Sequence, residues 1–500
     1  MSSHITGPDL PPPLRTRWRR LVGTEEPTEP IPVVEQLRGT PYRGLVRMDA
    51  PPQEDVRRSL ELVAGVAVML LRSGAGTAEV HTAVLATAAA LGLQDEALDV
   101  DITYGSVLMG YAPAGEPAVT LVRVVRAPGR DYARMCAVHA LVVDLAGGRL
   151  DRTGATARLA EIARSPKPYH RGVVSLAWGG LAACIVQLLG GTVVASLTAL
   201  VITAGVDQVG RLVSRRGLPP FFVTVIGGAL ATGAALLVGE LSAQVPTLGL
   251  TSVRGTGLVV AGGIVALLAG IGLVAAVQDG ISGFPVTAVG RLFSVLLTTS
   301  AIIAGVGAVL TVGAEIGGSG MLGDPLAGRP TGISWQAPVL AAVGAACSGL
   351  ANRAPPRLLV PIAVAGGGGY VLDLVVAAIG LPAALSAAVA SVFIGVVGRV
   401  WALRRRASPL AVVVPATTML LPGLVIFQGL REMTGGDAPG GLITLLSAGT
   451  IAMAIAAGVA LGDTLAAPVE RGLDVVHEHR HRGARSRRGQ PRDQSRGSEP

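Results

Sequence analysis

The sequence predicts an all-α polytopic membrane protein of about ten transmembrane helices in two inverted five-helix repeats, preceded by a small cytoplasmic α+β domain. Three observations predict this fold. Half of the 500 residues are hydrophobic and only 15% are charged, against about 25% in an ordinary globular chain. Apolar runs of about membrane-spanning length follow one another from residue 172 to 462. Two of these runs also resemble each other in sequence.

These patterns divide the chain into six segments. We expect a disordered Pro/Arg-rich segment (1–53), a cytoplasmic α+β domain (54–170), a first five-helix repeat (171–313), an extracytoplasmic connection (314–335), a second five-helix repeat (336–465) and a disordered basic tail (466–500). The first residues lack the apolar region of a signal peptide, so the N-terminus is expected to stay in the cytoplasm. The three cysteines are isolated, which predicts neither disulfide nor metal site.

The α+β domain is expected to contain four helices and two strands. Residues 54–72, 77–93, 130–148 and 152–166 have helical patterns, with Thr77 as the N-cap of the second helix, and residues 98–111 and 118–127 alternate as strands. The stretch "SGAGT" (73–77) lacks the Lys of a phosphate-binding loop and follows a helix, so a tight turn that docks two helices is favoured. His81 and His139 are interpreted as packed or solvated. No catalytic constellation stands out, and neither an enzyme nor a cofactor is expected.

Ten apolar runs are long enough to be candidate spans. They are 172–190, 192–210, 220–239, 257–277, 289–312, 336–352, 358–379, 382–402, 410–430 and 441–462. With the N-terminus inside, the cytoplasmic connections carry ten arginines and the opposite connections three. This bias agrees with the positive-inside rule and predicts both termini in the cytoplasm. Because the basic residues flank the spans, the net charge of +8 indicates orientation, and no nucleic-acid partner is expected.

The fourth and fifth spans resemble the ninth and tenth. Without gaps, "LLAGIGLVAAVQDGISG" (267–283) aligns with "LLPGLVIFQGLREMTGG" (420–436), so that Asp279 falls on Glu432. Five spans separate the two copies, and they therefore cross the membrane in opposite directions. That arrangement is typical of secondary transporters, in which substrate binds near the midplane at broken helices. Breaks are predicted at Gly270, at Pro422-Gly423 and at the glycine run 366–369.

Three stretches resemble the threonine/serine exporter family: "LLRSGAGTAEVHTAVLATAAALGL" (70–93), "QDGISGFPVTAVGRL" (278–292) and "PATTMLLPGLVIFQGL" (415–430). With the order of the regions, the resemblance covers residues 55–465. It implies an inner-membrane antiporter that exports threonine, serine and other small polar solutes and is driven by the proton gradient. A related branch resembles dicarboxylate exporters, so dicarboxylate export remains an alternative. A membrane scaffold or sensor whose cytoplasmic domain recruits partners is another.

Several polar groups at membrane depth are candidates for substrate binding or coupling. Asp373, three residues after Tyr370, is the leading carboxylate for proton coupling or for binding an amino group; an ion pair with a neighbouring helix is the alternative. Asp279 and Glu432 are interpreted either as gating or binding groups or as interfacial residues. Further candidates are Pro422, Gly423, Gly270, Thr417 and Thr418 around the breaks, and Asp207, for which a salt bridge with Arg211 is favoured. The expected partners are the small-molecule substrate, protons and the lipid bilayer; a homo-oligomer stays open.

Overall fold

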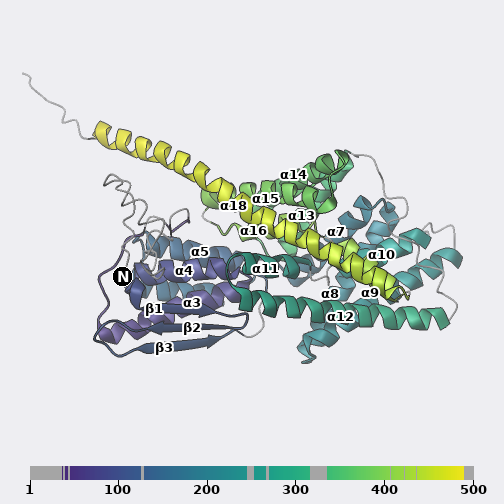
Figure 1. The fold of residues 1–500 in the computed structure, drawn as a ribbon, viewed down its shortest axis with the longest axis horizontal. Helices are drawn as coiled ribbons and strands as arrows, with labels where there is room; N and C mark the ends of the chain where they lie inside the picture. The colour runs from purple at the N-terminus through teal and green to yellow at the C-terminus, as the bar shows by residue number, and fades with distance from the viewer. Residues whose placement is uncertain are drawn as a thin grey trace, which may run out of the picture.

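The structure is a computed structural model that describes residues 37, 40–42, 45–125, 129–244, 253–265, 270–315, 335–405, 407–421, 423–434 and 436–488. Its N-terminal domain lies at one end of a long helical bundle (Figure 1). The elements of this domain, in chain order, are α3 (Gln53–Ser73), α4 (Thr77–Ala90), η1 (Asp95–Ala97), β1 (Leu98–Ile102), β2 (Ser106–Tyr111), β3 (Val119–Val124), α5 (Tyr132–Ala146) and α6 (Arg152–Arg164).

The sheet of this domain has three antiparallel strands in the order β1-β2-β3. The first predicted strand, residues 98–111, is instead a hairpin that reverses at residues 103–105, where Thr103 Oγ1 contacts Ser106 Oγ at 2.8 Å. Because its two arms continue the same alternation of apolar and polar residues, the pattern alone did not reveal the turn. α3, α4 and α5 pack together beside the sheet, and their shared face forms the domain's core.

Part of the predicted disordered segment 1–53 packs on this domain. Leu37 and Tyr42 are 1% and 2% exposed, and the amides of Val46 and Met48 donate to the carbonyls of Ala146 and Ala90 at 2.7 and 3.0 Å. The described residues of the segment therefore belong to the folded domain. Residues 1–36, on which the rest of that prediction falls, lie outside the described residues.

The bundle follows the predicted spans closely in chain order. Its helices are α7 (Arg171–Leu188), α8 (Val193–Arg215), α9 (Pro220–Gln244), α10 (Val253–Val265), α11 (Gly270–Ile281), α12 (Pro285–Glu315), α13 (Gln336–Ala351), η3 (Pro356–Leu358) with α14 (Leu359–Ala378), α15 (Ala383–Arg405), α16 (Leu410–Thr417), α17 (Gly423–Thr434) and α18 (Ala438–Arg488). In the described part of the chain, seven of these helices are long and apolar enough to cross a membrane, and α10, α11 and α13 are shorter apolar helices.

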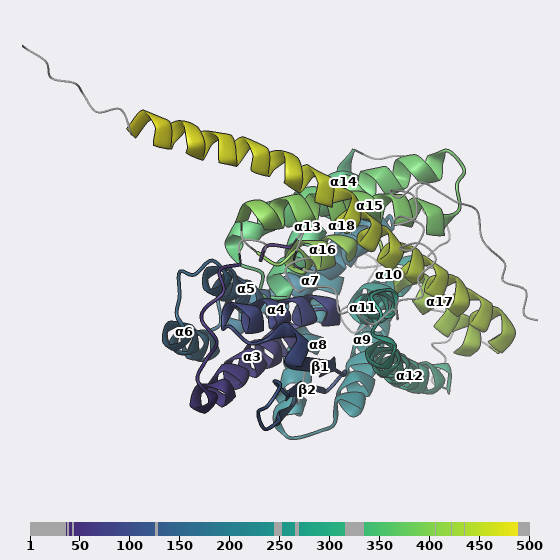
Figure 2. The ribbon, with the colours of Figure 1, turned by 60° about the vertical axis from the view of Figure 1, so that its left-hand side comes forward.

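The predicted ninth span is divided into two shorter helices, α16 and α17. Residues 418–421 between them form a turn and a bend, so the break predicted at Pro422-Gly423 is confirmed. The predicted fourth span corresponds to α10 and α11, and the break predicted at Gly270 stays a prediction, because residues 266–269 lie outside the described residues. Pro422 lies outside the described residues. Figure 2 shows α11 beside α12, with α17 farther from the N-terminal domain.

The third predicted break, at residues 366–369, is wrong, because α14 is continuous through the four glycines. They serve close packing instead. A Cβ on Gly366 would lie 2.4 Å from Ala345 Cβ of α13, and one on Gly369 would lie 2.6 Å from Ile394 Cδ1 of α15. A glycine run lowers helix propensity, but here the packing of two neighbouring helices depends on the missing side chains.

Glycines also bring two other helix pairs into backbone contact. Between α15 and α18, a Cβ on Gly462 would lie 2.3 Å from the carbonyl oxygen of Val392, and one on Gly458 would lie 2.4 Å from that of Ala388. Between α9 and α12, a Cβ on Gly305 would lie 2.2 Å from the carbonyl oxygen of Val225. The third and fifth helices of each predicted half thus pack without side chains between them at these points.

The last helix continues beyond its predicted span. The sequence predicts a span at 441–462 and a disordered tail from residue 466, whereas α18 runs without interruption to Arg488. The residues after 466 combine acidic and basic side chains with few helix breakers, which is compatible with a solvated helix. The C-terminal end of α18 lies on the side of the N-terminal domain (Figure 1).

Candidate functional site

The two half-helices α11 and α17 are built alike. Their acidic residues, Asp279 and Glu432, lie near the described ends of the two helices. Each helix ends in a turn with a positive-φ glycine, Gly283 (φ 87°) or Gly436 (φ 97°). In these turns the Phe284 amide donates to the Asp279 carbonyl at 2.9 Å and the Asp437 amide to the Glu432 carbonyl at 3.0 Å. The same capping geometry therefore recurs at the same sequence offset.

The Asp279 side chain joins the first half-helix to α12 and to the N-terminal domain. It is 3% exposed. Its Oδ2 lies 2.7 Å from Arg291 Nε, a close ion pair without the alignment of a hydrogen bond. Its Oδ1 accepts a hydrogen bond from the Thr77 amide at 3.1 Å, and Arg291 Nη2 donates to the Ala75 carbonyl at 3.4 Å. Thr77 is the first residue of α4, whose N-cap is Gly76 and not Thr77 as predicted.

The stretch "SGAGT" thus presents a helix N-terminus to a carboxylate of the same chain. The free amides and dipole at a helix N-terminus favour negative charge, and Asp279 supplies that charge where Gly76 has no side chain to cap the helix. A second N-terminus docks similarly. The amides of Tyr132 and Ala133, at the start of α5, donate to the carbonyls of Asn352 and Arg353 at 3.2 and 3.0 Å.

Glu432 occupies the corresponding place at the other end of the bundle. It is partly exposed, and its Oε2 accepts a hydrogen bond from Thr444 Oγ1 at 2.6 Å. Thr444 follows Glu432 at the same interval at which Arg291 follows Asp279. Thr444 and Asp463 both lie on α18, and Asp463 lies near the N-terminal domain. At 1.5 Å per residue the two are about 29 Å apart along the helix, which is close to the thickness of a bilayer core. α11 and α17 therefore end on opposite sides of the bundle.

Asp207 forms the ion pair with Arg211 that the sequence predicts, which is confirmed. Ser175 Oγ donates to Asp207 Oδ2 at 2.7 Å, and Arg211 Nη2 donates to Ser175 Oγ at 2.6 Å. The three side chains connect α7 and α8. The structure does not bring Asp207 to the broken helices, and a local structural role explains its contacts.

Tyr370 and Asp373 face different neighbours of α14. Tyr370 is 8% exposed and lies one helical turn after Gly366, whose missing side chain faces α13 and α16. Asp373 follows Gly369 by one turn on the α15 side, where its Oδ1 accepts from Ser386 Oγ at 2.7 Å. It lies five residues before the end of α14 and not near its centre as predicted.

Thr417 and Thr418 lie at the end of α16, beside the second break. Both hydroxyls donate to the Val414 carbonyl, at 3.0 and 3.1 Å, and Thr418 Oγ1 also contacts Ser348 Oγ of α13 at 2.9 Å. These bonds satisfy backbone groups near the break. Across the break, the Gly423 amide donates to the Leu421 carbonyl at 2.8 Å.

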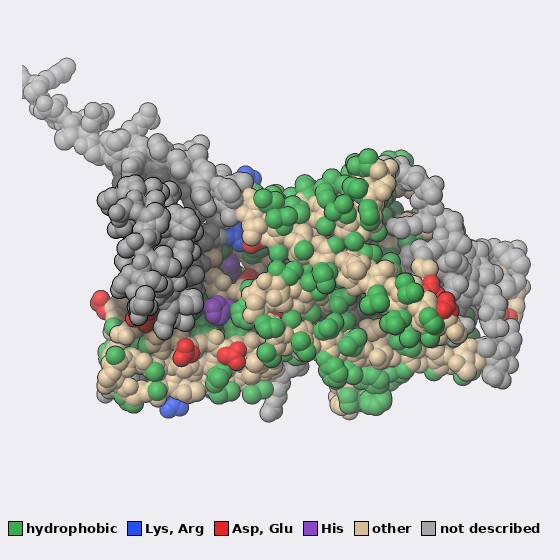
Figure 3. All heavy atoms as spheres, in the orientation of Figure 1, with side chains coloured by type: hydrophobic (Ala, Val, Ile, Leu, Met, Phe, Trp, Pro, Cys, Tyr) green, Lys and Arg blue, Asp and Glu red, His purple; other side chains and the backbone are tan. Residues whose placement is uncertain are grey.

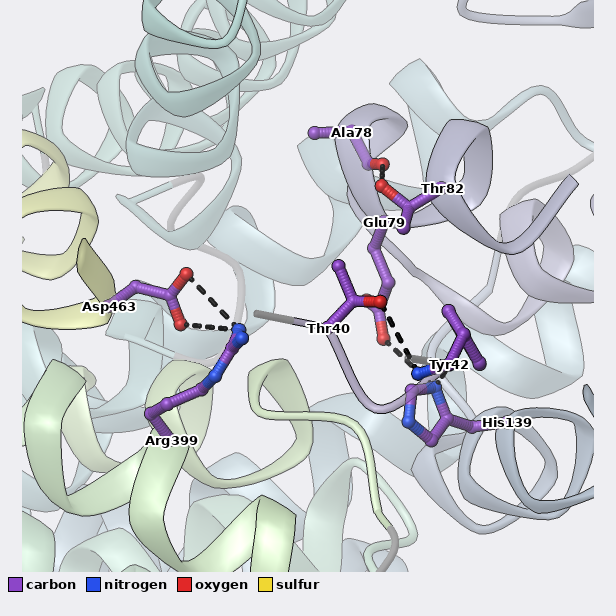
Figure 4. A network of polar contacts seen from close by, with 8 residues as sticks. All are labelled: Thr40, Tyr42, Ala78, Glu79, Thr82, His139, Arg399 and Asp463. Atoms are coloured by element: carbon purple, nitrogen blue, oxygen red, sulfur yellow. Dashed lines mark hydrogen bonds and ion pairs between the residues drawn. The ribbon is translucent and has the colours of Figure 1, made fainter. Parts of the chain in front are cut away.

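A further polar cluster lies where the N-terminal domain meets the bundle (Figure 4). Glu79 of α4 lies 4.0 Å from His139 Nδ1 of α5, and the same nitrogen contacts Tyr42 Oη at 2.8 Å. On the bundle side, Arg399 Nη1 of α15 donates to both carboxylate oxygens of Asp463 on α18, at 3.1 and 3.3 Å. The sequence did not reveal this cluster, because its members are far apart in the chain and the stretch 70–93, which contains Glu79, does not indicate what surrounds that residue.

The surface of the bundle is apolar. Hydrophobic side chains cover most of its visible face, whereas charged and histidine side chains lie over the N-terminal domain, at its junction with the bundle and, as a few acidic groups, at the opposite end (Figure 3). Large side chains such as Leu237 and Ile379, each 72% exposed, point outward. Exposed apolar area on this scale requires a nonaqueous surrounding. With seven candidate spans in the described residues, these features define a multi-pass membrane protein.

Comparison with known proteins identifies its family. The chain belongs to the threonine/serine exporter family: a family profile described as "Putative threonine/serine exporter" matches residues 61–313, and one described as "Threonine/Serine exporter, ThrE" matches residues 337–465. The chain is 31% identical over 434 residues to a "Probable threonine/serine exporter" of Mycobacterium tuberculosis, covering 84% of this chain and 78% of the relative.

A second relative supports the same family. The chain is 29% identical over 435 residues to a "Threonine/serine exporter" of Corynebacterium glutamicum, covering 86% of this chain and 87% of the relative. No solved structure matches the chain. The resemblance to this family, which three sequence motifs indicate, is thereby confirmed.

Proposed function

We propose that this chain is a secondary active exporter of threonine and serine across the inner membrane, driven by the proton gradient, with both termini in the cytoplasm. The family and the names of both relatives support the substrates. The observation that carries the transport mechanism is the duplicated unit of half-helix, acidic end and following helix, in α11–α12 and α17–α18.

The helix contacts support two inverted halves. Three helix pairs of the first half have counterparts in the second. The pair α7–α8 corresponds to α13–α14, α9–α12 corresponds to α15–α18, and α8–α10 corresponds to α14–α16. α7 and α13, the first helices of the two halves, pack against each other. Since α11 and α17 end on opposite sides of the bundle, the two halves run in opposite directions. In such carriers one half rocks against the other around a central site.

The breaks between α10 and α11 and between α16 and α17 provide the substrate site in this proposal. Threonine and serine are zwitterions, which need hydrogen-bond donors for the carboxylate and acceptors for the ammonium. Half-helix N-termini offer free amides, and half-helix C-termini offer free carbonyls. The N-termini at Gly270 and Gly423 would bind the carboxylate. The carbonyl end of α16, at Thr417 and Thr418, lies beside the second break.

The acidic ends of the half-helices are assigned as gates in this proposal. Asp279 binds Arg291 and the Thr77 amide on the side of the N-terminal domain, and Glu432 binds Thr444 on the opposite side. Opening of one contact while the other stays closed gives alternating access. Arg291 of α12, Arg353 after α13 and Arg399 of α15 all lie on the domain's side of the bundle, which supports their predicted cytoplasmic location.

The test is transport by the purified full chain in vesicles with labelled threonine, serine and succinate under an imposed pH gradient. We expect threonine and serine to move against their gradients when a proton gradient is present and to stop when an ionophore removes it. Competition by succinate would indicate dicarboxylate export instead. Absence of flux for all three substrates, with correct insertion, would contradict the carrier proposal and favour a scaffold or sensor.

A further inference from the structure

The Glu79 carboxylate is buried at the junction of the N-terminal domain and the bundle without a hydrogen-bond partner. Its side chain is 14% exposed, and both carboxylate oxygens are buried and without hydrogen bonds among the described residues. The Ser408 hydroxyl lies near enough to favour the charged carboxylate, but it forms no hydrogen bond of normal geometry. Burying an ionised carboxylate in this way is costly, and such groups usually bind a proton instead.

Among the described residues, no positively charged group of the domain acts on this carboxylate. His139 is 2% exposed, and burial lowers its pKa to about 4, so the imidazole is neutral near pH 7. Burial also raises the pKa of Tyr132 and of the Cys136 thiol to about 12 and raises that of Tyr42 well above its usual value. The ionisable groups that face Glu79 from the domain are therefore all uncharged.

In the described part of the bundle, the cation that acts on Glu79 is Arg399, and it already has a counter-ion. Arg399 favours the ionised form of Glu79, whereas Asp463 disfavours it, and the two form an ion pair with each other. Their effects on Glu79 largely oppose each other. Figure 4 shows the Arg399–Asp463 pair on one side of Glu79 and His139 on the other.

We propose that Glu79 is a proton-binding site at the boundary between the N-terminal domain and the bundle, holding its proton as a neutral carboxylic acid and releasing it to cytoplasmic water when the cytoplasm becomes more alkaline. The step is the ionisation of one carboxylic acid, with water as the proton acceptor. Burial raises the pKa of Glu79 to about 7, which places the exchange near neutral pH.

The charge on Glu79 then acts on the helix pair α15–α18. When Glu79 is neutral, the Arg399 guanidinium interacts with Asp463 without a competing anion from α4. When Glu79 is ionised, it repels Asp463 and attracts Arg399, which weakens the ion pair between these two side chains. Coupling of this site to export rests on the proposed function, whereas proton binding itself does not.

Infrared difference spectroscopy of the full chain in lipid, recorded while the pH is raised from about 5 to 9 across the stated pKa, tests proton binding directly. A protonated carboxylic acid has a carbonyl band that a carboxylate lacks. We expect a band that disappears with a midpoint near pH 7, is absent in Glu79→Gln and is retained in Glu61→Gln. Glu61 is a matched control because it lies on α3 of the same domain with its side chain 46% exposed.

Two results would overturn the proposal. Either no carboxylic acid band changes between pH 6 and 8, or the band persists unchanged in Glu79→Gln. The first would place any shared proton on His139 as an imidazolium–carboxylate pair. Should Glu79→Gln fail to fold, Glu79→Asp keeps an acid at the site, and the band must shift in frequency if Glu79 carries it. Because this readout needs no transport, it distinguishes failure of the proton site from failure of the exporter assignment.

Export measured at several pH values on the domain side then tests the coupling. With the pH gradient held constant, we expect wild-type flux to change between pH 6 and 8 and flux of Glu79→Gln to lose at least half of that change. An unchanged pH profile in Glu79→Gln, with the infrared band assigned to Glu79, would leave a proton site and contradict its coupling to export.

Discussion

Replacement of Asp279 by Asn tests whether its charge holds the N-terminal domain on the bundle. Asn keeps the size of the side chain and one oxygen for the Thr77 amide, but it removes the charge that faces Arg291 at 2.7 Å. Interactions of charged hydrogen-bonding groups contribute about 1.5–3 kcal/mol. Because Asp279 is 3% exposed, screening by water is small, and the full range applies.

The expected result is faster opening of the contact between α4 and α11. A loss of 1.5–3 kcal/mol corresponds to about a 10- to 150-fold larger open population, at 1.36 kcal/mol per factor of ten. Hydrogen–deuterium exchange of a peptide covering residues 74–80 measures this population in detergent or lipid. Glu432→Gln is the matched control, since its carboxylate contacts Thr444 far from the domain. Equal exchange at Thr77 in Asp279→Asn and wild type, or equal acceleration in the control, would refute the reasoning.

Three further predictions concern the second break, the glycine packing and the buried acid–histidine pair. Gly423→Leu should insert normally but lose most threonine flux, because it fills the start of the half-helix α17; flux at the wild-type rate would show that the break is only a packing detail. Gly366→Val should cost about 1–3 kcal/mol through overpacking against α13, seen as a lower unfolding temperature, whereas Gly205→Ala, which has open space, should be neutral or stabilising. The pKa of Glu79 is raised by burial to about 7 and that of His139 is lowered to about 4, so folding binds a proton at Glu79 and releases one at His139. Relative to wild type, Glu79→Gln should therefore lose stability as the pH falls from about 7 to 4.5, and His139→Gln as it rises from about 4 to 6.5, by about 3 kcal/mol each. Thermal unfolding across this range measures both, and slopes of the same sign would contradict them.

Local patterns in the sequence predicted the helices of the bundle well, because apolar length and the charges at span ends are properties of short segments. The predicted helix 54–72 corresponds to α3 (Gln53–Ser73), and the break before Gly423 followed from residue type. The glycine run of α14 was misinterpreted because its residue type alone also suggested a break. Whether glycine interrupts a helix or permits close packing depends on the neighbouring helices, which a local pattern does not contain.

The candidate site was predictable only where it repeats. Asp279 and Glu432 were found because one copy of the motif indicates the other. Glu79 was not found, because it is an acidic residue in the first turn of a mostly apolar helix and acquires its surroundings from residues 399, 408 and 463, more than 300 positions away in the chain. Such long-range contacts depend on the tertiary fold, and no spacing rule reveals them.

The glycine contacts of α9 with α12 and of α15 with α18 limit how an exporter built on this fold can move. Backbones that touch cannot slide past each other by a fraction of a turn without collision, so each pair should travel as one stiff body. Spin labels placed within a pair should keep a constant separation through the transport cycle. Labels on α12 and α17, which belong to different bodies, should report the motion.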